Sequence, residues 1–134
     1  MHMKREDTAP TPEQYKRRWR FYKTAGGARP IEAFLDTLSD EQQAAIYDEM
    51  SVVEHEGLIA ARHLRGDLYE VRASFQGQAF RVLFAAEGRF GQVLLALEAI
   101  SKKTRKIPPL TLELAEKRLS DWRARGRIQK GKEK

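Results

Sequence analysis

The sequence predicts an α+β fold, in which an N-terminal strand and a helical hairpin pack on a small, mainly antiparallel sheet, followed by a C-terminal helix. Three observations lead to this prediction. Apolar residues recur with a period of about 3.6 over residues 30–56, which indicates helix. They alternate with a period of two over residues 69–84, which indicates strands, and the helical period returns after Pro109.

Composition limits the chemistry that the chain can perform. With 134 residues we expect one domain, residues 18–125, between a flexible arm at 1–17 and an unstructured basic tail at 126–134. The absence of cysteine excludes disulfides, zinc-thiolate sites and thiol nucleophiles. No long apolar run and no signal-type start are present, so we expect a cytoplasmic protein. Residues 102–134 carry 12 Lys/Arg against 4 Asp/Glu, which favours a polyanionic partner such as nucleic acid.

The first third of the chain predicts one strand and two helices. Trp19–Tyr22 is a short aromatic run followed by a glycine pair, which is typical of a strand and its turn. Pro30 suits the first position of a helix. The apolar face of that helix is Ile31, Phe34, Leu35 and Leu38. Ser39 and Gln42 match a capping box and start a second helix, which Gly57 ends.

Three strands and a last helix follow Gly66. Alternating apolar residues mark two of the strands, namely Tyr69, Val71, Ala73 and Phe75, then Phe80, Val82 and Phe84. Residues 92–99 form the third strand, which completes a meander. The last helix buries Leu112, Ala115, Leu119 and Trp122. We expect its basic residues, Lys117, Arg118, Arg123 and Arg125, to form a solvated face with some affinity for RNA.

Two arginines become direct neighbours if residues 76–77 form a two-residue hairpin loop. Counting outward from the loop pairs Arg72 with Arg81 and keeps the apolar residues of both strands on the other face. Like charges directly opposite on a sheet cost about 0.2–1 kcal/mol. Either each arginine is paired with a carboxylate such as Glu70 or Glu98, or the two share an exposed patch that binds a phosphate. We favour the phosphate site because two planar guanidinium groups stand together.

The most apolar run of the chain, residues 93–100, leads at once into a basic run. Lys102, Lys103, Arg105 and Lys106 occupy the exit of the predicted third strand. In a simple meander this strand lies beside the hairpin, so we expect these cations at the rim of the sheet that carries the arginine pair. Taken alone, a basic strand end is more typical of a solvated edge.

An ordered set of short motifs resembles one known family. The motifs are Leu68–Arg72 (LYEVR), Phe80–Phe84 (FRVLF), Lys102–Pro108 (KKTRKIP) and Ala115–Arg118 (AEKR). Over about residues 18–125 the chain looks like the HigB-type toxins of the RelE/ParE superfamily, including their phage-derived branch. The resemblance implies a RelE-like fold and an endoribonuclease of a type II toxin–antitoxin system that cuts mRNA on the ribosome. It also implies inhibition by a HigA-like helix-turn-helix antitoxin. Ala99 and Ile100 depart from the pattern, because relatives often carry a glycine and an aromatic residue there.

The implied reaction needs no metal and no cofactor, because the 2′-hydroxyl of RNA is the nucleophile. We expect Arg72 and Arg81 to hold the non-bridging phosphate oxygens and to stabilise the charge of the pentacovalent state. Lys102 or Lys103 would assist proton transfer or the leaving 5′-oxygen. The expected products are a 2′,3′-cyclic phosphate and a 5′-hydroxyl.

Four further residues complete the predicted RNA-binding set. Arg105 and Lys106 would bind the flanking RNA backbone. Glu70 would either act as the base or orient Arg72. His63 precedes the strand that begins after Gly66, lies within reach of the site in this interpretation, and titrates in a useful range.

Two other functions remain open at this stage. ParE-like relatives with the same fold poison DNA gyrase and cleave no RNA, and fold alone does not separate the two activities. A non-catalytic nucleic-acid-binding module would need only the cations. The basic run beside paired arginines favours ribonuclease chemistry over both.

Overall fold

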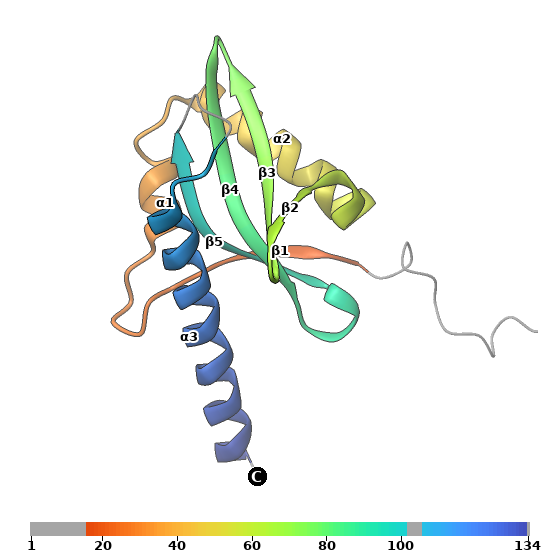
Figure 1. The fold of residues 1–134 in the computed structure, drawn as a ribbon, viewed down its shortest axis with the longest axis vertical. Coiled ribbons are helices and arrows are strands. Elements are labelled where there is room, and N and C mark those ends of the chain that lie inside the picture. Colours follow the sequence, from red (N-terminus) through yellow and green to blue (C-terminus); the bar gives the residue numbers. More distant parts are fainter. Residues whose placement is uncertain (1–15, 102–105, 134) are drawn as a thin grey trace, which may run out of the picture.

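The computed structural model describes residues 16–101 and 106–133 and has the predicted α+β architecture (Figure 1). The elements in chain order are β1 (Arg18–Phe21), α1 (Pro30–Leu35), α2 (Asp40–Glu56), η3 (Leu58–Ala60), β2 (Arg62–Arg65), β3 (Leu68–Phe75), β4 (Gln78–Glu87), η4 (Arg89–Gly91), β5 (Val93–Ser101) and α3 (Pro109–Glu133). The predicted N-terminal strand, both helices, the meander and the last helix are confirmed. The predicted arm lies outside the described residues except for its last two.

The strands form one five-stranded sheet in the order β1-β5-β4-β3-β2. All neighbours run antiparallel except β1 and β5, which are parallel. The sheet is therefore mixed. β2 was not predicted, because four residues are too few to show a period.

The β3–β4 hairpin has the predicted two-residue loop. Phe75 pairs with Gln78, and the two loop residues between them, Gln76 and Gly77, have φ values of 50° and 81°. Positive φ at both positions defines the type I′ turn, whose twist matches that of the strands. This loop sets the register of the two arginines.

Local signals at α2 act as predicted. Ser39 Oγ accepts from Gln42 N at 3.1 Å, and Gln42 Oε1 accepts from Ser39 N at 2.9 Å, so both bonds of the capping box are present. Gly57 ends the helix with a φ of 87°. The position of this glycine determines where the chain turns into η3 and β2.

The two faces of the sheet are covered by different helices. Trp19 packs edge-on against Phe84 at 4.9 Å between ring centroids and donates from Nε1 to Met50 O at 2.9 Å, which holds α2 against one face. On the other face Tyr22 donates to Asp121 of α3 at 2.6 Å. Figure 1 shows α3 in front of the sheet and α2 behind it. The main apolar core thus lies between α1, α2 and the sheet.

Helix α3 runs through Gly126 to Glu133, so the expected unstructured tail at 126–134 is wrong for all but its last residue, which is outside the described range. Each of its two glycines, Gly126 and Gly131, costs the helix about 1 kcal/mol, and the flanking residues are mostly helix formers. The buried residues Ala115 and Leu119 of α3 lie in its first half. Among the described helices, none is long and apolar enough to cross a membrane.

Candidate active site

Arg72 on β3 and Arg81 on β4 are direct cross-strand partners, as predicted. Opposed residues of an antiparallel pair project from the same face, and the row continues to Ile100 on β5. The next row on that face begins with Glu70, which is opposite Leu83. A carboxylate therefore lies diagonally across from Arg81.

Arg81 is buried, which corrects the expectation that both guanidinium groups lie on an exposed patch. Its side chain is 1% exposed, and Nη1 donates to the two carboxylate oxygens of Glu70 at 2.9 and 3.1 Å. Glu70 is 3% exposed. A buried cation without an anionic partner is costly, and the diagonal position supplies that partner. The alternative of a carboxylate-paired arginine is thus correct for Arg81.

Arg72 is in the opposite situation. Its side chain is exposed, and no carboxylate within the described part of the chain forms an ion pair with it. Glu70, predicted either to act as the base or to orient Arg72, is bonded to Arg81 instead. Arg72 therefore presents a guanidinium group that is available to an anion.

Strand β2 adds a third arginine, Arg62, which the sequence alone did not identify. Arg62 pairs with Glu70 across the β2–β3 ladder, and its Nη1 lies 3.7 Å from Glu70 Oε1. Its side chain is 58% exposed, so this contact is screened by solvent. Arg62 and Arg81 both contact the Glu70 carboxylate. Arg72 is the cross-strand neighbour of Arg81, so these four side chains together carry a net charge of +2. The only local signal for Arg62 was the Gly57–Gly66 interval that encloses the short strand.

A cavity of about 330 Å³ opens beside this cluster. Its lining includes the charged residues Arg62, Glu70 and Arg72 and the apolar residues 59–61 of the α2–β2 connection. Glu49 of α2 contributes a second carboxylate to the lining. The arginine cluster thus borders a hollow in which a ligand has room.

The end of β5 brings the predicted basic run to the neighbouring row. Ile100 is opposite Arg81, Ser101 is opposite Phe80, and Ser101 Oγ accepts from Gln78 Nε2 at 2.7 Å. Lys102, Lys103 and Arg105 lie outside the described residues, so their predicted position at the rim stays a prediction. Lys106, where the described chain resumes, is exposed.

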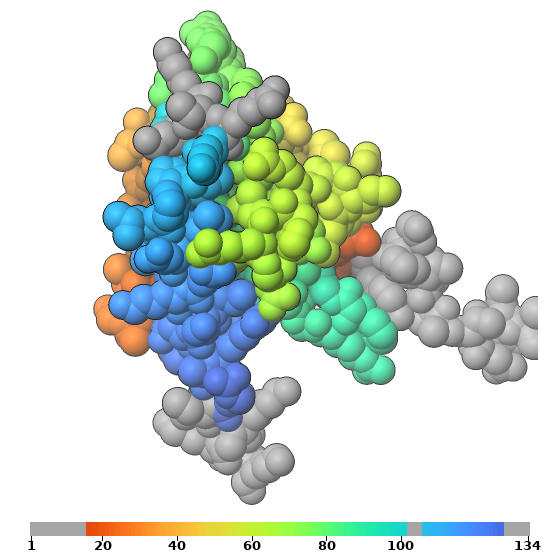
Figure 2. Space-filling view, viewed as in Figure 1, coloured from red at the N-terminus to blue at the C-terminus, as the bar shows by residue number. Residues whose placement is uncertain are grey.

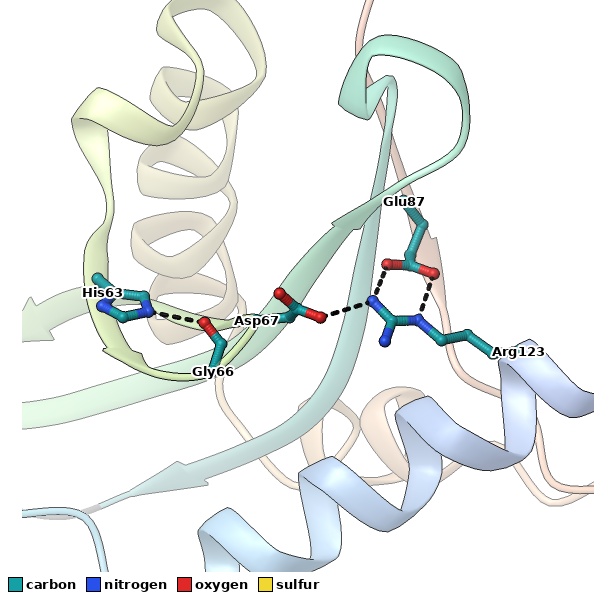
Figure 3. A network of polar contacts seen from close by, with 5 residues as sticks. All are labelled: His63, Gly66, Asp67, Glu87 and Arg123. Atoms are coloured by element: carbon teal, nitrogen blue, oxygen red, sulfur yellow. Dashed lines mark hydrogen bonds and ion pairs between the residues drawn. The ribbon is translucent and has the colours of Figure 1, made fainter.

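His63 lies on the other face of the sheet from Arg72. It pairs with Tyr69, its ring contacts the Tyr69 ring at 5.0 Å between centroids, and its Nε2 is 2.8 Å from Gly66 O (Figure 3). The sequence predicts that His63 reaches the site, whereas alternation along β2 directs it away from the arginine cluster. We therefore leave His63 out of the candidate active site.

Two of the four basic residues expected on a solvated face of α3, Arg118 and Arg123, bind the sheet instead, which corrects the expectation for these two. Arg123 donates to both oxygens of Glu87, at 3.0 and 2.7 Å, and to Asp67 at 3.0 Å (Figure 3). These bonds raise the pKa of Arg123. Arg118 donates to Leu97 O at 2.7 Å and contacts Glu98 at 3.3 Å. The pattern of charges on α3 did not reveal these partners, because they lie on distant strands.

Two further polar contacts hold α3. Arg65 of β2 donates to both carboxylate oxygens of Glu116 at 3.0 and 2.7 Å, and the space-filling view shows the β2 segment against α3 (Figure 2). The hydrogen bonds from Arg65 lower the pKa of Glu116. The hydrogen bond from Tyr22 lowers the pKa of Asp121, and burial together with that bond raises the pKa of Tyr22. One ion pair and one hydrogen bond thus join α3 to β2 and to the residue that follows β1.

Comparison with known proteins identifies the family. Residues 33–120 match the family described as phage derived protein Gp49-like (DUF891), and because the match spans more than half of the chain, the chain belongs to this family. It is also similar to two proteins of Mycobacterium tuberculosis, from strains CDC 1551 / Oshkosh and ATCC 25618 / H37Rv, each named "Probable endoribonuclease HigB1". Each is 32% identical over 108 residues, which is 78% of this chain and 84% of the relative. The predicted HigB-type toxin family is thereby confirmed.

Proposed function

We propose that this chain is an endoribonuclease toxin of a type II toxin–antitoxin system, which cuts mRNA on the ribosome by a metal-independent reaction. The observation that carries the proposal is Arg72, an exposed guanidinium with no ion-pairing carboxylate among the described residues, at the edge of a cavity and of a cluster with net charge +2. Membership of the Gp49-like family and similarity to proteins named as probable endoribonucleases support it.

Arg72 is the group that we expect to bind the scissile phosphate. A guanidinium group donates two parallel hydrogen bonds to phosphate oxygens, and its charge counts for more as the phosphorus gains negative charge in the transition state. Arg62 is exposed enough to leave Glu70 and bind a second oxygen or the next phosphate. Both arginines line the same cavity.

The reaction balances with groups of the RNA and the protein. The 2′-oxygen attacks phosphorus and releases its proton to a base, the bond from phosphorus to the 5′-oxygen breaks, and an acid protonates that oxygen. We assign Lys102 or Lys103 to proton transfer, and Arg105 and Lys106 to the flanking backbone. The products are a 2′,3′-cyclic phosphate and a 5′-hydroxyl.

Glu70 and Arg81 have a supporting role in this proposal. Glu70 is a positioning residue, because it fixes the Arg81 guanidinium through two hydrogen bonds. Arg81 then keeps a positive charge in the row of Arg72 where solvent screens it little. This assignment replaces a direct role of Glu70 as the base.

The natural partners in the proposal are a HigA-like helix-turn-helix antitoxin and ribosome-bound mRNA. The antitoxin would neutralise the toxin until it is degraded. Gyrase poisoning and non-catalytic nucleic-acid binding are the competing activities, and each gives a different result in the test below.

The test is induction of the full chain in bacterial cells with mapping of the 5′ ends of transcripts. The expected result is growth arrest with new cuts inside translated messages, both abolished by Arg72→Ala. Arg20→Ala is the matched control, because Arg20 is also an exposed strand arginine but belongs to β1. Arrest with broken chromosomal DNA and intact messages would instead identify a gyrase poison. Arrest without cleavage of either nucleic acid would favour the binding module.

A further inference from the structure

The cavity beside Arg72 is lined by residues of two kinds. Its apolar residues include the segment Ile59–Ala61, in which Ile59 is 89% exposed although it is a large aliphatic side chain. Its charged residues are Arg62 and Arg72 together with the acids Glu49 and Glu70. At this exposure Ile59 adds little to the apolar core. A lining that combines exposed apolar side chains with cations and acids suits a ligand that has both an apolar and an anionic part.

We infer that this cavity binds the nucleobase adjacent to the phosphate that Arg72 holds, and that it selects bases carrying an exocyclic amino group. The inference rests on the proposed function and specifies which part of the RNA is recognised. A nucleotide combines an anionic phosphate with a planar, weakly polar base. The phosphate matches the arginines of the lining, and the base matches its apolar residues. Its volume, about 330 Å³, lies at the lower end of the range of small-molecule sites.

The architecture of the sheet leaves this hollow open. β2 begins at Arg62, which pairs with Glu70, so β3 from Val71 to Phe75 has no strand on its outer side among the described residues. Proteins that read RNA sequence commonly splay single bases out of the stack into such recesses. A base that enters here would stack on the side chains of η3 while its phosphate stays at Arg72.

Glu49 supplies the selectivity. It lies on α2, lines the cavity and forms no ion pair within the described part of the chain. The other acid of the lining, Glu70, is already bonded to Arg81. An ionised carboxylate only accepts hydrogen bonds, and adenine, cytosine and guanine offer exocyclic amino donors whereas uracil offers none. We expect the cavity to favour these three bases over uracil.

A side chain of the antitoxin is the other occupant to be considered. It would explain the apolar part of the lining, but it would not explain why the same cavity holds Arg72, the arginine assigned to the scissile phosphate. A nucleotide accounts for both the apolar and the charged residues, and the peptide is kept as an outcome of the test.

The experiment compares two RNA oligonucleotides that differ only in cytosine or uracil beside the mapped cut. We expect full-length wild-type protein to cleave the cytosine substrate with about tenfold higher kcat/KM, the effect of one hydrogen bond to a charged acceptor. Glu49→Gln should bring the ratio close to one, because an amide both donates and accepts. Glu56→Gln, an exposed acid of α2 outside the cavity, is the matched control and should leave the ratio unchanged.

Binding gives a second readout that does not depend on cleavage. An oligonucleotide with a 2′-deoxy residue at the cut should shift the amide resonances of Ala60 and Ala61. Ala61→Leu, which fills the cavity, should weaken this binding about tenfold or more while the circular dichroism spectrum is retained, because the base then loses its apolar contact. Val52→Leu, an enlargement of an exposed aliphatic residue elsewhere, should not weaken it.

The outcomes separate this inference from the proposed function. If wild type cuts RNA but Glu49→Gln and Ala61→Leu behave like their controls, the inference is wrong and the ribonuclease stands. If Ala61→Leu weakens binding of the antitoxin and leaves RNA untouched, the cavity belongs to the protein partner. If wild type cuts no RNA, the proposed function itself fails.

Discussion

Two groups of arginines on the same side of the sheet, one on α3 and one on the strands beside the cavity, differ in how their charge is balanced. On α3, Arg118 and Arg123 each bind a carboxylate, and Arg123 binds two. Beside the cavity, Arg62 and Arg81 both contact a single carboxylate, Glu70, and Arg72 forms no ion pair with a carboxylate of the described residues. Arginines whose charge is balanced by carboxylates hold elements of the fold together. Arginines in excess of the carboxylates repel one another, lower stability and favour the binding of an anion. The difference between the regions therefore separates arginines of the fold from arginines of the site.

The largest effect on stability is expected at the buried pair of Glu70 and Arg81. This pair is the part of the cavity region that most resembles the α3 region, because its arginine is bound to a carboxylate. Glu70→Ala leaves Arg81 buried without a carboxylate and should lower the free energy of unfolding by about 3–5 kcal/mol. Urea denaturation at neutral pH measures this loss. Glu98→Ala is the control, because its partner Arg118 is partly exposed and also donates to a backbone carbonyl, so the loss there should be smaller.

A double variant tests whether that pair has a role beyond stability. Replacing Glu70 and Arg81 together by leucine and methionine removes both charges and should recover much of the lost stability. RNA cleavage should stay low in the double variant, because the fixed charge beside Arg72 is gone. Recovery of cleavage together with stability would show that the pair is only structural.

The next largest effect is expected on RNA cleavage, at Arg72. Arg72→Ala should lower the rate of RNA cleavage by about 10²–10³-fold, the usual loss when one preorganised transition-state donor is removed. Its effect on the free energy of unfolding should stay within about 0.5 kcal/mol, because the side chain is exposed. Single-turnover cleavage and urea denaturation of the same preparation give both values. A stability loss as large as that of Glu70→Ala would erase the contrast between the regions.

The sequence was sufficient to predict the placement of Arg72 and Arg81 but not their environments. A two-residue loop and strict alternation fix a hairpin register, because a slip of one residue would turn the core face outward. Burial of Arg81 depends instead on the diagonal Glu70 and on what covers that row, which no local pattern encodes. The missed strand containing Arg62 shows the same limit, because four residues carry no readable period.

The same reasoning explains the errors at α3. Its amphipathic positions predicted buried Ala115 and Leu119, and both are buried. The partners of Arg118 and Arg123 come from strands 20 or more residues away along the chain, so the sequence showed only charges. Gly126 predicts the end of the helix, although glycines among helix formers lower helix stability without stopping the helix, and α3 continues through both Gly126 and Gly131.

A smaller effect on stability is expected in the α3 region, where carboxylates balance the charge of Arg118 and Arg123. Arg123→Ala should lower the free energy of unfolding by about 1–2 kcal/mol, because it removes charged hydrogen bonds to Glu87 and Asp67 at a site that is partly exposed. RNA cleavage per folded molecule should not change. Arg127→Ala, an exposed arginine on the same helix, serves as the control. If folded Arg123→Ala protein lost RNA cleavage, an α3 arginine would belong to the active site. The distinction between arginines of the fold and arginines of the site would then be wrong.

The smallest effect is a pH dependence of the contacts that hold α3. The hydrogen bond from Tyr22 lowers the pKa of Asp121 below its ordinary value of 3.8, so the folded state favours the ionised carboxylate. The contribution to stability is present above the unfolded pKa and is lost as pH falls through the lower folded pKa. Urea midpoints measured from neutral pH down to about pH 2 should therefore fall less steeply for Asp121→Asn than for wild type. Because Asp121 is distant from Arg72 in the fold, cleavage at neutral pH should be equal in the two proteins, and a changed cleavage rate would show that the two regions are coupled.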